Sequence, residues 1–257
     1  MGSASADGAP RLPTPLDRGE WVPGLYPKDR LGSAIALTFD DVPRKNFAPY
    51  ALDQLARYNV PATFFVEGDL ARVLPDSIRR MVAEGHEVGN HSWSHANLAS
   101  LAPDAIDREF ERTQRIVSDA LGASHPMPLI RPPFGAPWYG RFDVFDRAKV
   151  ARAIAKQDGA CVLWQRSSHD TLPGATAKRV YDEVTEAVDK SLGGIFVFHP
   201  TVAARRALPR ILKMLREREV EVVTVTELLQ RKYGCSLTEL LRLPTRLSPR
   251  PKLASSQ

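Results

Sequence analysis

The sequence predicts an α/β fold built on a parallel sheet or barrel. Apolar runs of about four to six residues alternate with segments of helical periodicity, the order expected of repeated strand–helix units. The chain has 257 residues, 43% of them hydrophobic, which is enough for one large core, and α/β barrels of this size are commonly single domains. Polar side chains follow several predicted strands, at the end of the sheet where such barrels build their active sites.

Seven short apolar runs are predicted to be strands. In chain order they are Ala34–Phe39, Thr63–Val66, Glu87–Asn90, Leu129–Arg131, Cys161–Trp164, Ile195–Phe198 and Glu221–Val223. Each is bounded by turn residues or by a helical pattern, as expected of strands buried in a parallel sheet.

The segments between these strands are predicted to be helices. In order they are Ala48–Tyr58, Asp76–Glu84, Asp104–Leu121, Ala148–Lys156, Thr176–Ser191, Ala204–Glu217 and Glu227–Tyr233. Several end at a glycine (Gly85, Gly122, Gly193, Gly234), and Thr224 with Glu227 forms a capping pair before the last.

The predicted domain organisation is a catalytic domain over residues 31–235 between two surface segments. Residues 1–30 are predicted to be an N-terminal arm or leader, and residues 236–257 a C-terminal tail, because both are Pro-rich and unpatterned. The first six residues resemble an added leader, which is compatible with removal of a native export signal. No run approaches the roughly 18 apolar residues that a membrane span needs.

The charge and cysteine content of the chain indicate which kinds of binding partner to expect. The formal charge is +5, but Lys and Arg are scattered among acidic neighbours, with neither a basic stripe nor a nucleic-acid-binding motif. We therefore expect no nucleic-acid partner, whereas an anionic cell-wall polymer is compatible with the charge. Cys161 and Cys235 form neither a disulfide framework nor a clustered metal site. The oligomeric state is not readable from the sequence.

Two motifs supply ligands for a metal. His91 and His95 lie four residues apart after a short apolar run, and Asp40 and Asp41 follow another. Two His and one Asp with an open position make a catalytic zinc arrangement, which acidifies bound water, and the second carboxylate is then free to act as a base. Taken alone, the aspartates also fit a surface turn, and the histidines a packing pair.

The same sheet end collects further polar residues. Arg131 ends the fourth predicted strand, His169 and Asp170 follow the fifth, and His199 follows the sixth. Carboxyl ends of parallel strands meet at one edge, so we expect these side chains near Asp40 and His91.

The ordered set of motifs resembles the polysaccharide deacetylase family, which are metal-dependent carbohydrate esterases. The matching stretches are Thr38–Asp41, Ala62–Gly68, Gly85–His95, Arg131–Gly135 and Ile195–His199. The resemblance covers roughly residues 33 to 230. It implies an irregular (β/α) barrel of about seven parallel strands with surrounding helices.

The resemblance also implies roles for the first two motifs. Asp40 resembles the family's general base, and Asp41, His91 and His95 resemble its metal ligands. It implies one divalent metal, most often zinc, with cobalt and manganese as alternatives for such a mixed N/O site.

Roles for the remaining motifs follow in the same way. The resemblance implies that Arg131 orients Asp40 and keeps it ionised. It also implies that the Phe134 N–H stabilises the oxyanion that forms on the acyl carbonyl. It implies that His199 is the general acid, and that Phe198 walls the pocket for the acetyl methyl group.

The chain departs from the family pattern in two places. Val42 stands where the family usually has Gly after the aspartates. In the block that begins at Trp164, the register puts Ser167 where the family has the Asp that tethers the acid His. Asp170 is the only nearby carboxylate, so we expect Asp170 to be the tether instead.

These observations predict a metal-dependent hydrolase that removes acetyl groups from an acetylated oligo- or polysaccharide, and we expect one that contains N-acetylglucosamine. Two alternatives remain open: hydrolysis of a non-sugar amide or cyclic imide on the same fold, and a non-catalytic glycan-binding protein with an eroded site. An extracytoplasmic location is expected, with the cytoplasm as the alternative.

Overall fold

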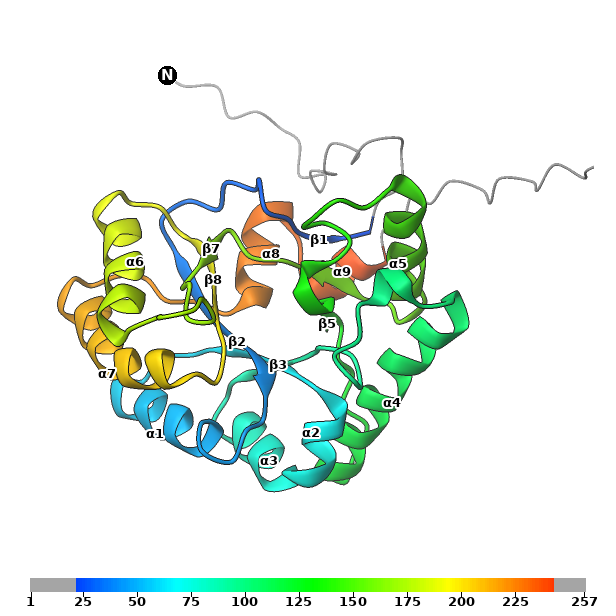
Figure 1. Ribbon diagram of the computed structural model, residues 1–257, viewed down its shortest axis with the longest axis horizontal. Helices are drawn as coiled ribbons and strands as arrows, with labels where there is room; N and C mark the ends of the chain where they lie inside the picture. The colour runs from blue at the N-terminus through cyan, green and yellow to red at the C-terminus, as the bar shows by residue number, and fades with distance from the viewer. Residues whose placement is uncertain (1–21, 243–257) are drawn as a thin grey trace, which may run out of the picture.

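The protein is built around one curled parallel sheet. The computed structural model describes residues 22–242. Its eight strands run in the order β1-β6-β5-β4-β3-β2-β8-β7. All neighbouring pairs are parallel. The strands curl into a partial barrel with the helices around it (Figure 1), so the predicted α/β fold is confirmed.

Six of the seven predicted strands are strands of the sheet. The bounds are β1 Gly24–Leu25, β2 Ile35–Val42, β3 Thr63–Val66, β4 Glu87–Asn90, β5 Leu129–Ile130, β6 Ala160–Val162, β7 Arg166–Ser167 and β8 Gly194–Phe198. The seventh prediction, Glu221–Val223, is wrong as a strand, because this segment makes only an isolated bridge between Val222 and Ile35. The short strands β1 and β7 were not predicted, since two residues carry no readable periodicity.

All seven predicted helices are present, and two short ones join them. The bounds are α1 Ala48–Tyr58, α2 Gly68–Val73, α3 Pro75–Ala83, α4 Pro103–Leu121, α5 Val144–Lys156, α6 Ala177–Asp189, α7 Val202–Glu217, α8 Val225–Tyr233 and α9 Leu237–Leu241. Helix α5 begins earlier than predicted because the Asp143 carboxylate accepts a hydrogen bond from the Asp146 N–H and caps it.

Strand β2 shows how the sheet separates its two faces. Leu37 and Phe39 point outward and pack with α1 and α7 in the larger apolar core. Ala36 lies inside the barrel, in a second apolar core that it shares with residues of α8. Because strand side chains alternate, Asp40 continues the inward set of Ala36 and Thr38. The fold thereby directs a carboxylate into the barrel mouth.

The predicted domain limits are too narrow at both ends. Within the predicted arm 1–30, β1 pairs with β6, and Leu25 is fully buried. Within the predicted tail 236–257, α9 buries Leu240 against the inner core. Both elements are held by long-range packing, which no local pattern reveals. Residues 1–21 and 243–257 lie outside the described residues.

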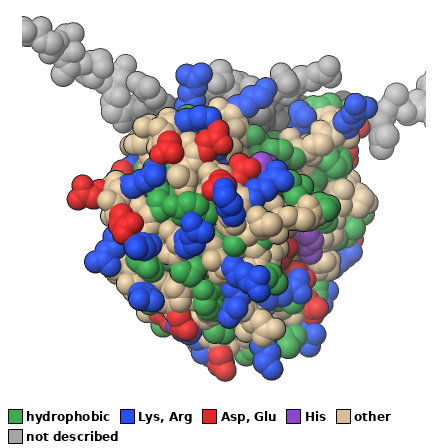
Figure 2. Space-filling model, turned by 60° about the vertical axis from the view of Figure 1, so that its left-hand side comes forward, with side chains coloured by type: hydrophobic (Ala, Val, Ile, Leu, Met, Phe, Trp, Pro, Cys, Tyr) green, Lys and Arg blue, Asp and Glu red, His purple; other side chains and the backbone are tan. Residues whose placement is uncertain are grey.

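Charged groups are spread over the surface. On the face shown in Figure 2, Lys and Arg side chains are interspersed with acidic and hydrophobic ones. Many pair along their own helix, as Lys178 does with Asp182 and Lys190 with Glu186. Such exposed pairs contribute little to stability.

None of the helices in residues 22–242 combines the length and the hydropathy that crossing a bilayer requires.

Candidate active site

The end of β2 carries two adjacent carboxylates that both face the barrel mouth. Consecutive strand residues normally point to opposite faces. Here the register with β3 shifts between Phe39 and Val42, and Asp41 has a φ of 56°. A bulge of this kind re-aims side chains. As a result Asp40 Oδ2 and Asp41 Oδ1 lie 3.8 and 3.4 Å from the Nε2 atom of His91.

The two histidines come from the loop that follows β4. His91 Nδ1 lies 2.7 Å from the Arg131 carbonyl oxygen, which orients the ring and leaves Nε2 facing the aspartates. His95 Nε2 lies 3.1 Å from Asp41 Oδ1. Ser92 and His95 both have positive φ, at 67° and 55°, and the Ser92 hydroxyl accepts a hydrogen bond from the His95 N–H. This compact turn brings both rings to one side.

Asp41, His91 and His95 fit a divalent cation. One ligand atom from each lies within 4.8 Å of the others, the only such group among residues 22–242. Asp41 Oδ1 is buried and has no hydrogen-bond donor in the described part of the chain. Lone pairs that converge without a donor are the arrangement that a cation satisfies, and a mixed N/O set suits zinc, cobalt or manganese.

Glu109 of α4 holds the loop between the histidines, and the sequence did not point to it. Its carboxylate accepts hydrogen bonds from the N–H groups of Trp93 and Ser94 at 2.9 and 2.8 Å. The Ser94 hydroxyl donates to the same carboxylate at 3.0 Å. The only signal was a carboxylate on a predicted helix, and several acidic residues there share that property.

Arg131 is buried and ion-paired with Asp40. Its Nη1 donates to Asp40 Oδ1 at 2.6 Å and to the Thr38 hydroxyl at 2.8 Å, while Nε donates to the Val162 carbonyl at 3.0 Å. The guanidinium also lies 3.9 Å from the centre of the Phe65 ring. Burial lowers the pKa of Arg131, and the charge of Asp40 opposes this shift. The predicted pairing of Arg131 with Asp40 is therefore present in the structure.

Asp170 lies against His199. Asp170 Oδ1 is 2.9 Å from His199 Nδ1, and Oδ2 accepts hydrogen bonds from the His199 N–H at 2.7 Å and the Thr201 hydroxyl at 3.2 Å. Ser167 instead accepts a hydrogen bond from the His169 N–H. Burial lowers the pKa of His199, but the hydrogen bond to Asp170 and the nearby carboxylates outweigh burial and leave this pKa raised.

The structure places Phe198 away from the site, contrary to the prediction. Phe198 is 1% exposed and packs in the outer core, with its ring 5.7 Å from that of Phe39. Alternation along β8 explains the error: Phe196 and Phe198 face the helices, whereas Val197 and His199 share the inner face. Val42 is also buried in this outer core and does not line the site.

Phe134 lies at the rim beside the histidines. Its side chain is 58% exposed, and its ring meets that of His95 edge to face at 4.6 Å. Its φ is 60°, so the backbone turns sharply after the two prolines. The predicted use of its N–H as an oxyanion donor stays a prediction.

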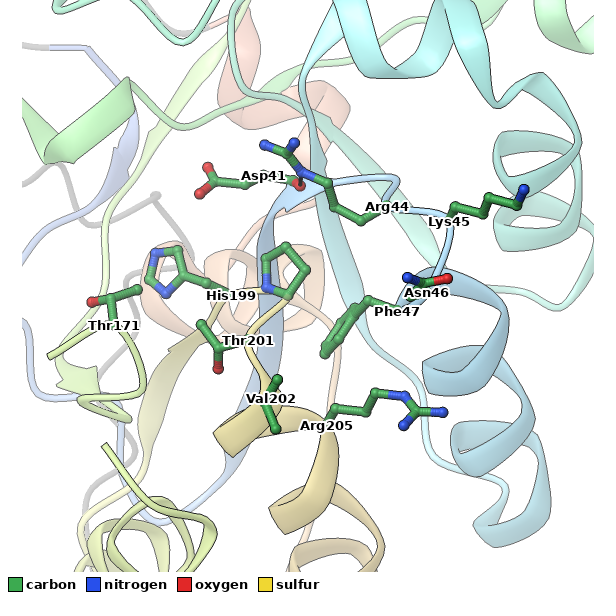
Figure 3. A pocket seen from close by; sticks show the side chains of 11 residues that line it. Asp41, Arg44, Lys45, Asn46, Phe47, Thr171, His199, Thr201, Val202 and Arg205 are labelled. Carbon is green, nitrogen blue, oxygen red and sulfur yellow. Dashed lines mark hydrogen bonds between the residues drawn. The ribbon is translucent and has the colours of Figure 1, made fainter. Parts of the chain in front are cut away.

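A groove of about 600 Å³ opens from the site between the β2–α1 loop and the start of α7. Asp41, Thr171 and His199 lie at one end, and Lys45, Asn46 and Arg205 lie at the other (Figure 3). An extended ligand in this groove would reach the Asp41 and His199 side chains.

Comparisons with known proteins identify the relatives of this arrangement. The sequence profile described as polysaccharide deacetylase matches residues 28–160. A peptidoglycan-N-acetylglucosamine deacetylase of Listeria monocytogenes is 32% identical over 210 residues, which cover 80% of this chain and 41% of the relative. A peptidoglycan-N-acetylglucosamine deacetylase of Bacillus cereus is 29% identical, covering 83% of this chain and 78% of the relative.

A solved structure gives the same result. The crystal structure of a peptidoglycan N-acetylglucosamine deacetylase in complex with an N-oxidanyl-benzamide compound has a TM-score of 0.68 and 28% identity, covering 80% of this chain and 92% of that one. This chain spans about two fifths of the length of the Listeria relative. The profile match extends over more than half of the chain, so this protein belongs to the polysaccharide deacetylase family.

Proposed function

We propose that the protein is a divalent-metal-dependent hydrolase that removes acetyl groups from an N-acetylated glycan, with zinc as the metal. The observation that carries the proposal is the convergence of three groups at one sheet end: the Asp41, His91 and His95 ligand set, the Asp40–Arg131 pair, and the Asp170–His199 pair. The names of the relatives support an N-acetylglucosamine-containing polymer of the cell envelope as substrate, and hence action outside the cytoplasm.

Asp41, His91 and His95 would hold the metal. When bound, a divalent cation supplies a Lewis acid that polarises an acyl carbonyl and acidifies water. The Phe134 N–H would donate a hydrogen bond to the carbonyl oxygen as negative charge develops there.

Two side chains handle protons on either side of the acyl carbon. Asp40 accepts a proton from the attacking water, and its ion pair with Arg131 holds the carboxylate in place for this task. His199, protonated and held by Asp170, donates a proton to the sugar nitrogen as the carbon–nitrogen bond breaks. The products are acetate and a free amine on the sugar.

Acetate release tests the proposal directly. The purified protein is incubated with N-acetylglucosamine oligomers, an acetylated xylan and a cyclic imide, with and without a chelator. We expect acetate from the N-acetylated oligomers, and a fall of about 10²-fold or more with chelator that added zinc reverses. Turnover of the cyclic imide alone, or acetate release unaffected by metal removal, would contradict the proposal.

The Asp170→Asn substitution tests the role of the Asp170–His199 pair. Asp170 raises the pKa of His199, and a general acid works only below its pKa. Without the carboxylate the pKa of His199 falls, so the alkaline limb of the kcat/KM profile should move to lower pH. Turnover at neutral pH should fall as well.

Ser167→Ala is the matched control, since Ser167 contacts His169 rather than His199. We expect its pH profile to keep the position of the wild-type alkaline limb. A profile unchanged in Asp170→Asn, measured on a substrate for which chemistry limits turnover, would remove Asp170 from this role.

A further inference from the structure

The groove beside the site is strongly basic at the end remote from His199. Arg44, Lys45 and Arg205 line it, and Asp41 is the sole acidic residue among its described lining residues. Because Asp41 belongs to the proposed metal-ligand set, a bound cation would offset its negative charge. Lys45 and Arg205 therefore carry positive charge that no other carboxylate lining the groove offsets.

The three cations are open to solvent, and two lack acidic partners. Within residues 22–242, neither Lys45 nor Arg205 forms an ion pair with a carboxylate, and the Arg205 guanidinium lies 4.2 Å from the centre of the Tyr50 ring. Stacking on an aromatic ring leaves the edge of a guanidinium free to donate hydrogen bonds. These groups can therefore bind an anionic ligand without first breaking a salt bridge.

Arg44 links the basic end to the catalytic end. Its Nε donates to the Asp41 carbonyl oxygen at 3.2 Å, which anchors the side chain next to the metal ligands. Its Nη2 lies 3.8 Å from Glu67 Oε2, and the side chain is still 50% exposed. In Figure 3 its guanidinium is directed toward Asp41, whereas Lys45 and Arg205 extend to the other side of the groove. Cations thus lie at both ends of the groove.

Between the two ends the lining is apolar. Pro200 and Val202 lie there, and Val202 is 66% exposed, whereas the neighbouring Phe47 is 3% exposed and adds little surface. An apolar strip of this kind suits the face of a sugar ring that carries C–H groups. A glycan with its acetyl group at His199 would place a neighbouring sugar over this strip, with substituents that reach Lys45 and Arg205.

We propose that this groove is a subsite for a carboxylate-bearing sugar next to the acetylated one, so that the enzyme prefers an anionic glycan over a neutral one. The inference rests on the proposed deacetylase function. Lys45 and Arg205 bind the carboxylate by charge-assisted hydrogen bonds, which are stronger than neutral ones. The neutral sugar backbone uses the apolar strip in either kind of glycan.

Matched oligomers test the subsite. Three tetramers are compared: N-acetylglucosamine alone, N-acetylglucosamine alternating with N-acetylmuramic acid, and the alternating tetramer with its carboxylates converted to amides. Binding is measured by calorimetry, and acetate release is measured in parallel. We expect the acid form to bind about tenfold more tightly than the amide form at low salt. This preference should shrink as ionic strength rises.

Two double variants that each remove two positive charges separate carboxylate binding in the groove from the effect of the protein's net charge. Lys45→Gln/Arg205→Gln should lose most of the preference for the acid form. Arg206→Gln/Lys213→Gln removes two exposed cations that do not line the groove and should keep it.

Equal affinity for acid and amide forms, or a preference retained in Lys45→Gln/Arg205→Gln, would overturn the subsite. Failure of the deacetylase proposal has a different signature. In that case no tetramer yields acetate, while the calorimetric comparison of acid and amide forms still reports on the groove.

Discussion

The double substitution His91→Ala/His95→Ala is expected to reduce the metal content of the purified protein from about one divalent ion per chain to background. Both Nε2 atoms face Asp41 Oδ1, at 3.4 and 3.1 Å, so their removal leaves a single carboxylate, which holds a transition metal weakly. Deacetylation should be lost with the metal. Elemental analysis of the protein, with acetate release measured alongside, checks both effects.

His169→Ala is the control for histidine loss. His169 lies at the same sheet end but pairs with Glu183, at 2.9 Å, and takes no part in the ligand cluster. Its metal content should match that of the unmodified protein. Full occupancy in the His91→Ala/His95→Ala protein would refute the assignment of the site.

Asp40→Asn should reduce kcat by about 10²-fold or more while the metal stays bound. The amide cannot accept the proton of the attacking water, but Asn has nearly the same shape and Asp40 is not one of the proposed ligands. Arg131 is fully buried and would lose its counter-charge, which costs about 3–5 kcal/mol of stability for such a pair. Rates are therefore compared below the melting temperature of the variant.

Metal analysis of Asp40→Asn separates the two aspartates. Retained metal with lost activity agrees with a base at Asp40 and a ligand at Asp41. Loss of metal would mean that these two roles are reversed, and activity near the wild-type level would remove Asp40 from the mechanism.

Much of the fold was predictable because strands and helices leave local patterns. Thr63–Val66 and Glu87–Asn90 coincide with β3 and β4, and helix ends at Gly122 and Gly234 follow from glycine in the left-handed conformation. Elements held by distant contacts were missed. Strand β1 exists because β6 pairs with it, and α9 docks through Leu240.

The site was predictable in its residue types and less so in its geometry. The prediction that Asp170 lies against His199, although Ser167 occupies the expected register, agrees with the 2.9 Å contact, and its catalytic role stays a prediction. The prediction for Phe198 failed because the two faces of β8 cannot be told apart in a run that is apolar on both sides. Glu109 could not be predicted, since its partners, the Trp93 and Ser94 N–H groups and the Ser94 hydroxyl, lie on a loop distant in the sequence.

By itself the sequence determined which chemical groups are present, their order, and their positions just after buried strands, which is sufficient for the fold class and the family. The tertiary structure decided which of those groups meet. The bulge at Asp41 turns two consecutive carboxylates to one side, and positive φ angles at Ser92, His95 and Phe134 aim the loops. Such conformations are unfavourable for an isolated chain and persist only where surrounding contacts impose them, so no local pattern encodes them.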